Sequence, residues 1–235
     1  MSAPKALKLR LWSAFELENW RAVEEHGEAC LAEGDEDPEI YGAIAVAKAR
    51  LSDRDEAERL ADAARRAAPE DPSVLCRVTE VQLISERYDE AEETLAHVRR
   101  IDPENVRGLT LLCHAARFRR DAKALSIRIN ALAAHDPDPV LMSILSGELA
   151  LLEGNQYAAE AHFRLVLSHE PESFVAHLNL AILNFMLGHA EEALPHATAA
   201  ATIRPESRIA RKMTDVLRRF DNRLLRAWFS ISVFL

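Results

Sequence analysis

Residues 171–205 read PESFVAHLNLAILNFMLGHAEEALPHATAAATIRP, and this stretch decides the fold because a proline stands at each end of it. The same interval recurs along the chain, since Pro69, Pro103, Pro137, Pro171 and Pro205 are evenly spaced. These prolines stand between a segment that ends in basic or histidine residues and one that opens with acidic residues, as in Arg204-Pro205-Glu206. A helix favours cations at its carbonyl end and anions at its amide end, and proline cannot continue a helix. Each proline therefore marks the end of one helix and the start of another.

A second break divides each unit about halfway, at residues 52–55, 86–89, 119–121, 154–156 and 188–189. Apolar residues between the breaks recur with helical spacing, as Ala91, Leu95 and Val98 do. The sequence thus predicts two short helices per unit. Neither helix can bury its apolar stripe alone, so stacked neighbouring units must supply the core.

Composition favours helices and excludes several classes of function. Of the 235 residues, 49% are hydrophobic, while glycine (7) and proline (10) are scarce, so glycine-rich phosphate loops are absent. The net charge of -9 argues against nucleic-acid binding, which needs clustered Lys and Arg. The three cysteines, Cys30, Cys76 and Cys113, form no CxxC or metal-ligand spacing. The first residues lack the apolar run of a secretory signal, so we expect the repeats to lie in the cytoplasm.

The repeated unit resembles the tetratricopeptide repeat family, whose unit has about 34 residues, small residues where paired helices touch and a proline at its end. The last unit matches best, with Leu180-Ala181, Gly188, Ala193, Ala200 and Pro205. The resemblance implies an all-α fold, a right-handed superhelix of about six 34-residue helical hairpins plus a C-terminal capping helix.

On this basis residues 1–205 are predicted to form the repeats, with a degenerate first unit at 5–35 and regular units at 38–205. Residues 206–235 are predicted to form an amphipathic capping helix with an apolar tail. That tail contains Trp228, Phe229, Ile231, Phe234 and Leu235 and follows several arginines. Three interpretations stay open: it packs as core or as a homo-oligomer contact, it meets or enters a membrane, or it docks into a partner protein.

No catalytic chemistry is visible in the sequence. Nine histidines invite a search, but no HExxH, GxSxG, Walker or dinucleotide motif is present. His162 and His169, like His189 and His196, stand seven residues apart without a converging carboxylate or cysteine. We therefore expect no enzyme activity, no metal and no cofactor.

The resemblance also nominates binding residues, because the first helices of such repeats line a concave surface. The candidates are Arg77, Glu80, Arg107, His114, Arg117, Ile144, Glu148, Leu178, Ile182 and Phe185. They are basic in the middle of the chain and apolar toward its end, which suggests a ligand segment with an acidic part and an apolar part.

The leading hypothesis is a cytoplasmic scaffold or adaptor that binds a segment of another protein in its concave groove. The scaffold would act either free or within a membrane-linked assembly at the inner face of a membrane. The alternative is a docking or regulatory module of a larger membrane or enzymatic protein whose remainder lies beyond residue 235.

Overall fold

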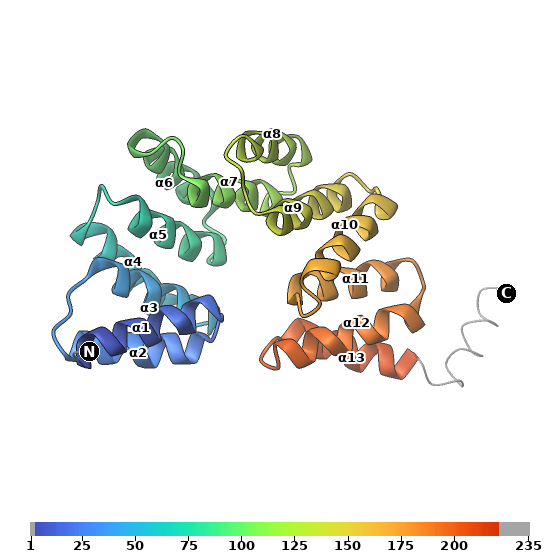
Figure 1. The fold of residues 1–235 in the computed structure, drawn as a ribbon, viewed down its shortest axis with the longest axis horizontal. Helices are drawn as coiled ribbons and strands as arrows, with labels where there is room; N and C mark the ends of the chain where they lie inside the picture. Colours follow the sequence, from blue (N-terminus) through green and yellow to red (C-terminus); the bar gives the residue numbers. More distant parts are fainter. Residues whose placement is uncertain (1–2, 221–235) are drawn as a thin grey trace, which may run out of the picture. The chain divides into compact units, whose positions relative to one another are not determined.

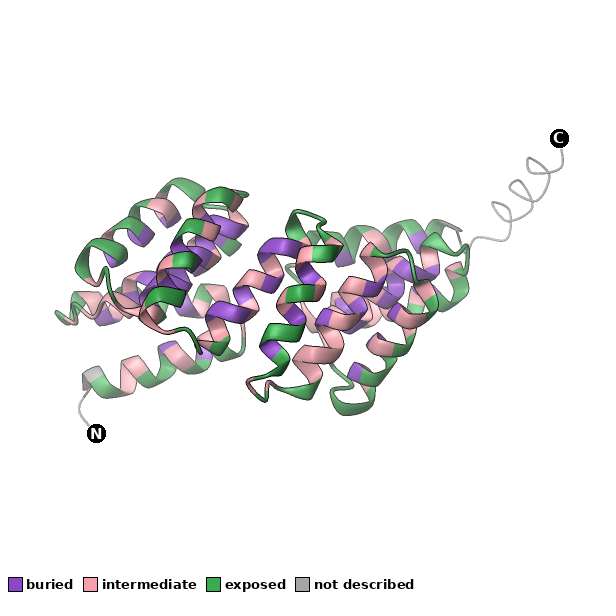
Figure 2. Cartoon of the chain, turned by 90° about the horizontal axis from the view of Figure 1, so that it is seen from above, coloured by how far each residue is buried: buried purple, intermediate pink, exposed green. Residues whose placement is uncertain are grey.

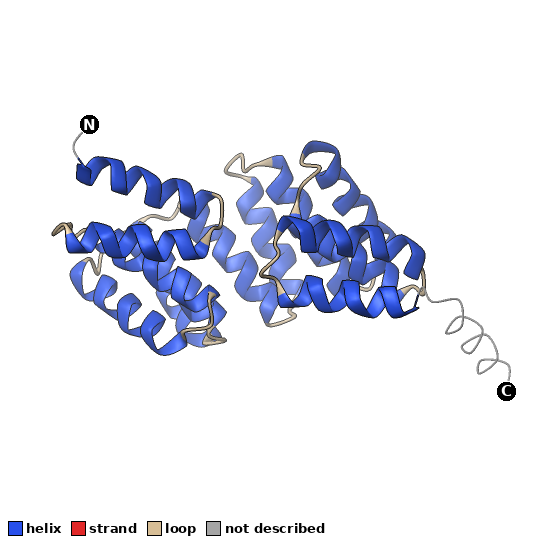
Figure 3. Ribbon diagram, turned by 90° about the horizontal axis from the view of Figure 1, so that it is seen from below, coloured by secondary structure: helices blue, strands red, loops and turns tan. Residues whose placement is uncertain are grey.

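Helices and the turns between them make up all of the chain that the structure, a computed structural model, describes, which is residues 3–220 (Figure 3). Thirteen helices follow one another in this range. They are α1 (Ala3–Glu16), α2 (Trp20–Ala32), α3 (Pro38–Arg50), α4 (Arg54–Ala67), α5 (Pro72–Ile84), α6 (Tyr88–Ile101), α7 (Val106–Phe118), α8 (Ala122–Ala133), α9 (Pro139–Leu152), α10 (Gln156–His169), α11 (Phe174–Met186), α12 (Ala190–Ile203) and α13 (Arg208–Phe220).

The chain divides into two compact units, residues 1–135 and residues 136–235. In unit 1 the helices pair as the hairpins α1–α2, α3–α4, α5–α6 and α7–α8 (Figure 1). In unit 2 the hairpins are α9–α10 and α11–α12, and α13 packs on α12 and α11. Six hairpins and a last single helix confirm the predicted all-α fold. The division into repeats at 1–205 and a capping segment at 206–235 stays a prediction.

The helix boundaries follow local signals in the sequence. Each helix before a repeated proline ends shortly ahead of it, as α4 ends at Ala67 before Pro69 and α6 at Ile101 before Pro103. Asp or Asn residues cap many of the following helices: the Asp71 carboxylate accepts hydrogen bonds from the amides of Ser73 and Val74 at 2.8 and 3.4 Å. Such caps satisfy amides that the first helical turn leaves unpaired.

The turn inside every hairpin contains one residue with a left-handed backbone. In unit 1 these residues are Glu18, Ser52, Glu86 and Arg120, with φ of 52°, 73°, 64° and 57°, and in unit 2 they are Gly154 and Gly188, with φ of 75° and 80°. They recur at the same interval as the prolines. Arg120 thus makes the same turn without glycine that Gly154 and Gly188 make with it.

Small residues let the paired helices approach closely. Ala57, Ala91, Ala159 and Ala193 hold the same position in the second helices and are fully buried. In unit 2 a Cβ added to Gly147 of α9 would lie 2.9 Å from the ring of Phe163, the largest fully buried side chain. Figure 2 shows the buried residues along the helix faces that meet their neighbours.

All three cysteines lie in unit 1, and all are buried with free thiols. Burial raises the pKa of Cys76 to about 11. Its Sγ lies 3.7 Å from the side-chain oxygen of Asn105, between α5 and α7. The thiols thus act as small core residues, as the sequence predicts.

The described part of the C-terminal segment is the helix α13, which buries Ala210, Thr214 and Leu217 against α11 and α12 of the same unit. The predicted tail residues lie outside the described residues: Trp228, Phe229, Ile231, Phe234 and Leu235.

Candidate functional site

The first helices α5 and α7 of unit 1 bring charged candidates together. Arg107 of α7 donates to Glu80 Oε1 of α5 from Nη2 at 2.7 Å and from Nε at 3.2 Å. The side chains stay 35% and 19% exposed, respectively. A partly exposed ion pair of this kind adds little to stability, because solvent screens it and its side chains lose entropy. The pair therefore leaves Arg107 within reach of a competing carboxylate.

Arg77 of α5 lies deeper than the groove assignment implies, with only 6% of its surface exposed. Its guanidinium carbon stands 4.4 Å from the ring centre of Phe15 and 4.7 Å from that of Trp12, both on α1. Its stem covers Gly42 of α3, where an added Cβ would lie 2.9 Å from Arg77 Cδ. The aromatic faces attract the cation, so Arg77 of α5 stabilises the packing of α1, which it reaches by passing over α3.

The polar atoms of Arg77 are incompletely paired. Its Nη2 approaches Glu39 at 3.7 Å, while the buried Nε and Nη1 have no hydrogen-bond partner within residues 3–220. Burial, with a contribution from the positive charge of Arg107, lowers the pKa of Arg77 to about 10. Arg77 is therefore still charged at neutral pH, and its position supports the first helices rather than offering a free contact.

His114 and Arg117 lie further along α7. Burial, together with the positive charges of Arg117 and Arg50, lowers the pKa of His114 to about 4. Its buried Nδ1 has no hydrogen-bond partner in the described part of the chain. The Arg117 guanidinium carbon lies 4.1 Å from the ring centre of Phe118. His114 is thus neutral at pH 7, and Arg117 carries the positive charge of this part of α7.

In unit 2 the candidates on α9 and α11 are mostly apolar. Ile144 packs beside the core around Phe163, and Phe185 packs beside Ala181 and Ala193. Leu178 and Ile182 stand one turn apart on α11 and are partly exposed, as is Glu148 of α9. The candidates on the first helices are therefore mainly charged in unit 1 and mainly apolar in unit 2.

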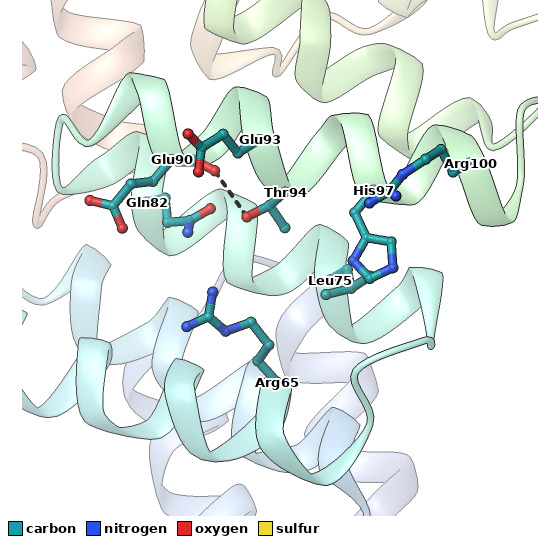
Figure 4. A pocket seen from close by; sticks show the side chains of 8 residues that line it. All are labelled: Arg65, Leu75, Gln82, Glu90, Glu93, Thr94, His97 and Arg100. Carbon is teal, nitrogen blue, oxygen red and sulfur yellow. Dashed lines mark hydrogen bonds between the residues drawn. The ribbon is translucent and has the colours of Figure 1, made fainter.

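A shallow pocket of about 210 Å³ lies elsewhere in unit 1, between the second helices α4 and α6 and over α5 (Figure 4). Arg65 of α4 faces it from one side, and Glu93, His97 and Arg100 of α6 from the other. At its floor lies Gln82 of α5, whose buried Oε1 has no partner within the described residues. Nothing in the sequence indicates this pocket, since its lining comes from three helices and forms no local motif.

Two histidines of unit 2 meet in a way that their spacing does not reveal. His177 Nε2 of α11 lies 2.9 Å from the carbonyl oxygen of Pro171, so this nitrogen donates. The Nδ1 atoms of His177 and His196 of α12 lie 3.0 Å apart, so His196 donates to His177. Burial and His177 lower the pKa of His196. The seven-residue spacing in the sequence instead pairs His196 with His189.

Among residues 3–220, no group of three or more His, Cys, Asp or Glu side chains is placed to hold a metal ion. The described helices also include none that is both long and apolar enough to cross a bilayer. The polar and apolar groups described in this part of the chain are ion pairs, partly buried histidines and partly exposed apolar side chains.

The comparisons with known proteins agree with this architecture. No model of a known protein family matches the sequence, and no curated protein does. Many solved structures match the fold. A chain of the APC/C hetero-tetramer Cut9-Hcn1 superposes with a TM-score of 0.74 at 12% identity, over 92% of this chain and 43% of that one. A TPR protein of Thermus thermophilus gives 0.67 at 19% identity, over 77% and 98%.

The chain has the tetratricopeptide-repeat fold. Yeast Tom70 is a further neighbour, with a TM-score of 0.58 at 13% identity over 88% of this chain. This chain spans less than half of the matched Cut9-Hcn1 and Tom70 chains, 43% and 46% of their lengths. The likeness establishes the tetratricopeptide-repeat fold that the spaced prolines predict.

Proposed function

We propose that this chain is a non-enzymatic protein-interaction scaffold, which holds a segment of another protein against the first helices of its hairpins. The observation that carries the proposal is the partly exposed Arg107–Glu80 ion pair between the first helices α5 and α7. Core packing does not need an ion pair at this position, and the pair contributes little to stability. A bidentate guanidinium, however, is well suited to recognise a carboxylate.

Unit 2 supports an apolar component of the same ligand. Leu178 and Ile182 form a partly exposed apolar strip on α11. Ile144 of α9 holds the position in its hairpin that Leu178 holds in the next one. Apolar side chains on a first helix gain free energy when a ligand covers them. An acidic part of a ligand would thus find charged positions on the first helices of unit 1, and an apolar part would find apolar positions on those of unit 2.

The fold neighbours support a role in assembly. One is part of the hetero-tetramer Cut9-Hcn1, and another, PilW, is described as a type IV pilus biogenesis factor. Proteins of this fold thus include members of multi-protein systems. For the present chain, the identity of the partner is set by the ligand chemistry and not by these neighbours.

Site-specific photo-crosslinking tests the proposal. A photoreactive amino acid replaces Thr110, which is partly exposed on the first helix α7, and in a second variant Ala96, which is exposed on the second helix α6. The full-length chain is then irradiated with peptides selected for binding from a display library. We expect crosslinks from Thr110 and none from Ala96.

Substitutions then identify the contacts. Arg107→Ala and Ile182→Ser should each weaken binding of the selected peptides about tenfold, the loss of one charge-assisted hydrogen bond or one buried apolar side chain. Arg66→Ala, at an exposed position of α4, is the matched control and should leave binding unchanged. Equal crosslinking from Thr110 and Ala96, or full affinity in both site variants, would refute binding at the first helices.

A second candidate is a docking or regulatory module of a longer membrane or enzymatic polypeptide. The observation that favours it is the greater length of the Cut9-Hcn1 and Tom70 neighbours, of which this chain spans 43% and 46%. Sequencing the gene beyond the codon for Leu235 tests it. A continuous reading frame with a further domain supports the module, and an immediate stop codon refutes it.

The finer parts of the proposal concern location. We place the scaffold in the cytoplasm, at the inner face of a membrane, where it would serve a membrane-linked assembly. Fractionation of cells that express the full chain tests this placement. Recovery of the protein with the membranes, and its release from them by salt, supports the placement. Recovery only outside the cytoplasm refutes it.

A further inference from the structure

The last described helix, α13, has two faces of different character. Its inner face buries Ala210, Thr214 and Leu217 against α11 and α12. Its outer face exposes two apolar side chains, Ile209 at 61% and Val216 at 39%. They stand seven residues apart, which is two helical turns, so they lie on the same side of the helix.

Exposed cations lie beside these apolar residues: Lys212 stands three residues after Ile209, and Arg219 three residues after Val216. Arg208, Arg211, Lys212, Arg218 and Arg219 are all exposed, and Asp215 is the one acidic residue among positions 208–219. With five cations and one anion, this stretch carries +4, whereas the whole chain carries -9. The remaining residues therefore carry -13, so the charge of α13 is opposite to that of the chain it belongs to.

Within the described residues, the cations of α13 lack the acidic partners that those of unit 1 have. Arg128 pairs with Glu92 at 2.9 Å and Arg87 with Glu58 at 3.2 Å, both between elements of unit 1. No ion pair joins any of the five α13 cations to a carboxylate within residues 3–220. Their charge is thus available to a ligand outside the described fold.

We propose that the outer face of α13 binds an anionic phospholipid surface, with Ile209 and Val216 entering the interface and the neighbouring Lys212 and Arg219 contacting the headgroups. This inference rests on the membrane-linked part of the proposed function and deepens it. It stands or falls separately from peptide binding, since vesicle binding is measured without peptide.

The charge pattern selects this occupant over others. A second copy that met the first through the same helix would bring five like charges against five, which repel. Residues 221–235 contain Arg223, Arg226 and Asp221, a net charge of +1, which does not complement the cations either. A cationic helix with exposed apolar residues suits a flat anionic interface.

Electrostatics also orients the molecule on such a surface. An anionic membrane attracts basic residues near it and repels acidic ones, and the effect decays within a Debye length. The strongly negative remainder of the chain is therefore held away while α13 approaches. The sequence that follows, AWFSISVFL at 227–235, carries no charged side chain and leaves this attraction unopposed.

Co-sedimentation of the full chain with vesicles tests the proposal. Wild-type protein should bind vesicles that contain phosphatidylglycerol and phosphatidylcholine at low salt, and should not bind pure phosphatidylcholine vesicles. The double variant Lys212→Gln/Arg219→Gln should lower the partition coefficient by about tenfold or more, since each cation near an anionic surface contributes substantially. Ile209→Ser/Val216→Ser should also weaken binding and should leave a remainder that salt removes.

The matched control is Arg21→Gln/Arg66→Gln, which removes two exposed cations from unit 1 and should bind vesicles as the wild type does. All variants keep residues 221–235, so any contribution of that segment cancels. Wild-type binding by the Lys212/Arg219 variant, or no binding of wild type to anionic vesicles, would overturn the proposal. Release from vesicles by an equimolar acidic peptide, with tighter binding to that peptide, would overturn it in favour of a protein partner.

Discussion

The two units build the same turn from different residues, and the contrast shows what the repeat demands. The left-handed position inside the hairpin holds glycine twice in unit 2, at Gly154 and Gly188, and never in unit 1, where Ser52, Glu86 and Arg120 are among its occupants. A residue with a Cβ adopts this backbone at a cost that glycine avoids. The hairpin thus requires a left-handed backbone at this position, but it does not require a particular residue type there.

The faces of the first helices differ in the same manner. Equivalent positions hold Glu80 and His114 in unit 1, and Glu148 and Ile182 in unit 2. Small residues where the helices cross and prolines between hairpins recur from unit to unit. The residue types at the nominated binding positions of the first helices vary. The fold therefore constrains the contacts between helices and leaves the chemistry of the nominated positions free to differ between units.

The largest expected effect separates the cores of the two units. Phe163→Ala should destabilise unit 2 by about 3–5 kcal/mol, because it removes a fully buried ring and leaves a cavity below Gly147. Hydrogen exchange measured helix by helix should rise in α9 to α12 and stay unchanged in α3 to α6. Tyr157→Ala, on the same helix but 87% exposed, is the control. Equal acceleration in both units would show that they unfold as one.

Arg77 provides a test that is confined to unit 1. Arg77→Ala should cost about 2 kcal/mol in unfolding free energy, because Trp12 and Phe15 lose both the cation and the packed stem. Arg77→Met should change it by less than about 1 kcal/mol, since methionine keeps the stem and removes the Nε and Nη1 atoms, which have no hydrogen-bond partner within the described residues. Chemical denaturation of both variants checks this. A methionine variant as unstable as the alanine variant would contradict the account.

Acidification should weaken unit 1 through His114. Its folded pKa of about 4 lies below the ordinary value near 6.5, so the unfolded chain binds a proton first as pH falls. Stability is complete above about pH 6.5 and falls as the pH drops toward 4, by roughly 1–2 kcal/mol at pH 5. Denaturation at pH 7 and pH 5 measures the loss, which His114→Gln should reduce.

The corresponding control in unit 2 is His196→Gln, whose wild-type pKa is also lowered by burial and by His177. Hydrogen exchange at both pH values assigns each loss to its unit. The comparison would fail if His114→Gln left the acid sensitivity of α7 unchanged.

The smallest expected effect concerns the turns. Gly188→Ala should lower the unfolding free energy by about 1 kcal/mol, because alanine is strained at φ of 80°. Glu86→Gly should raise it by no more than about 0.5 kcal/mol, because relief of strain is partly offset by the entropy of glycine in the unfolded chain. Thermal unfolding of both variants tests the opposite signs. Effects of the same sign would contradict the equivalence of the two turns.

Helix boundaries could be predicted from the sequence because their signals are local. Pro72 and Asp71 start α5 through contacts with neighbouring residues, and Pro103 separates α6 from α7. The break at 119–121 lacks the glycine of the breaks in unit 2, yet Arg120 makes the turn. The turn forms there without the local glycine signal, because the stacked neighbouring helices impose its backbone.

Contacts between distant helices could not be predicted. The position of Arg77 on α5 assigns it to the groove, but Trp12 and Phe15 reach it across Gly42, which no periodicity records. The pairing of His177 with His196 likewise depends on how α11 and α12 pack. The nominated binding residues as a set, and their contact with a ligand, stay predictions.

The buried cysteines are built-in probes of local opening in unit 1. Cys30, Cys76 and Cys113 are its only thiols, and all belong to unit 1. A thiol reagent can react with them only when that half of the molecule transiently exposes its interior, since the reactive thiolate needs access to solvent. The rate of colour development with such a reagent would therefore report the rate of local opening of unit 1, in the natural protein and without an added label.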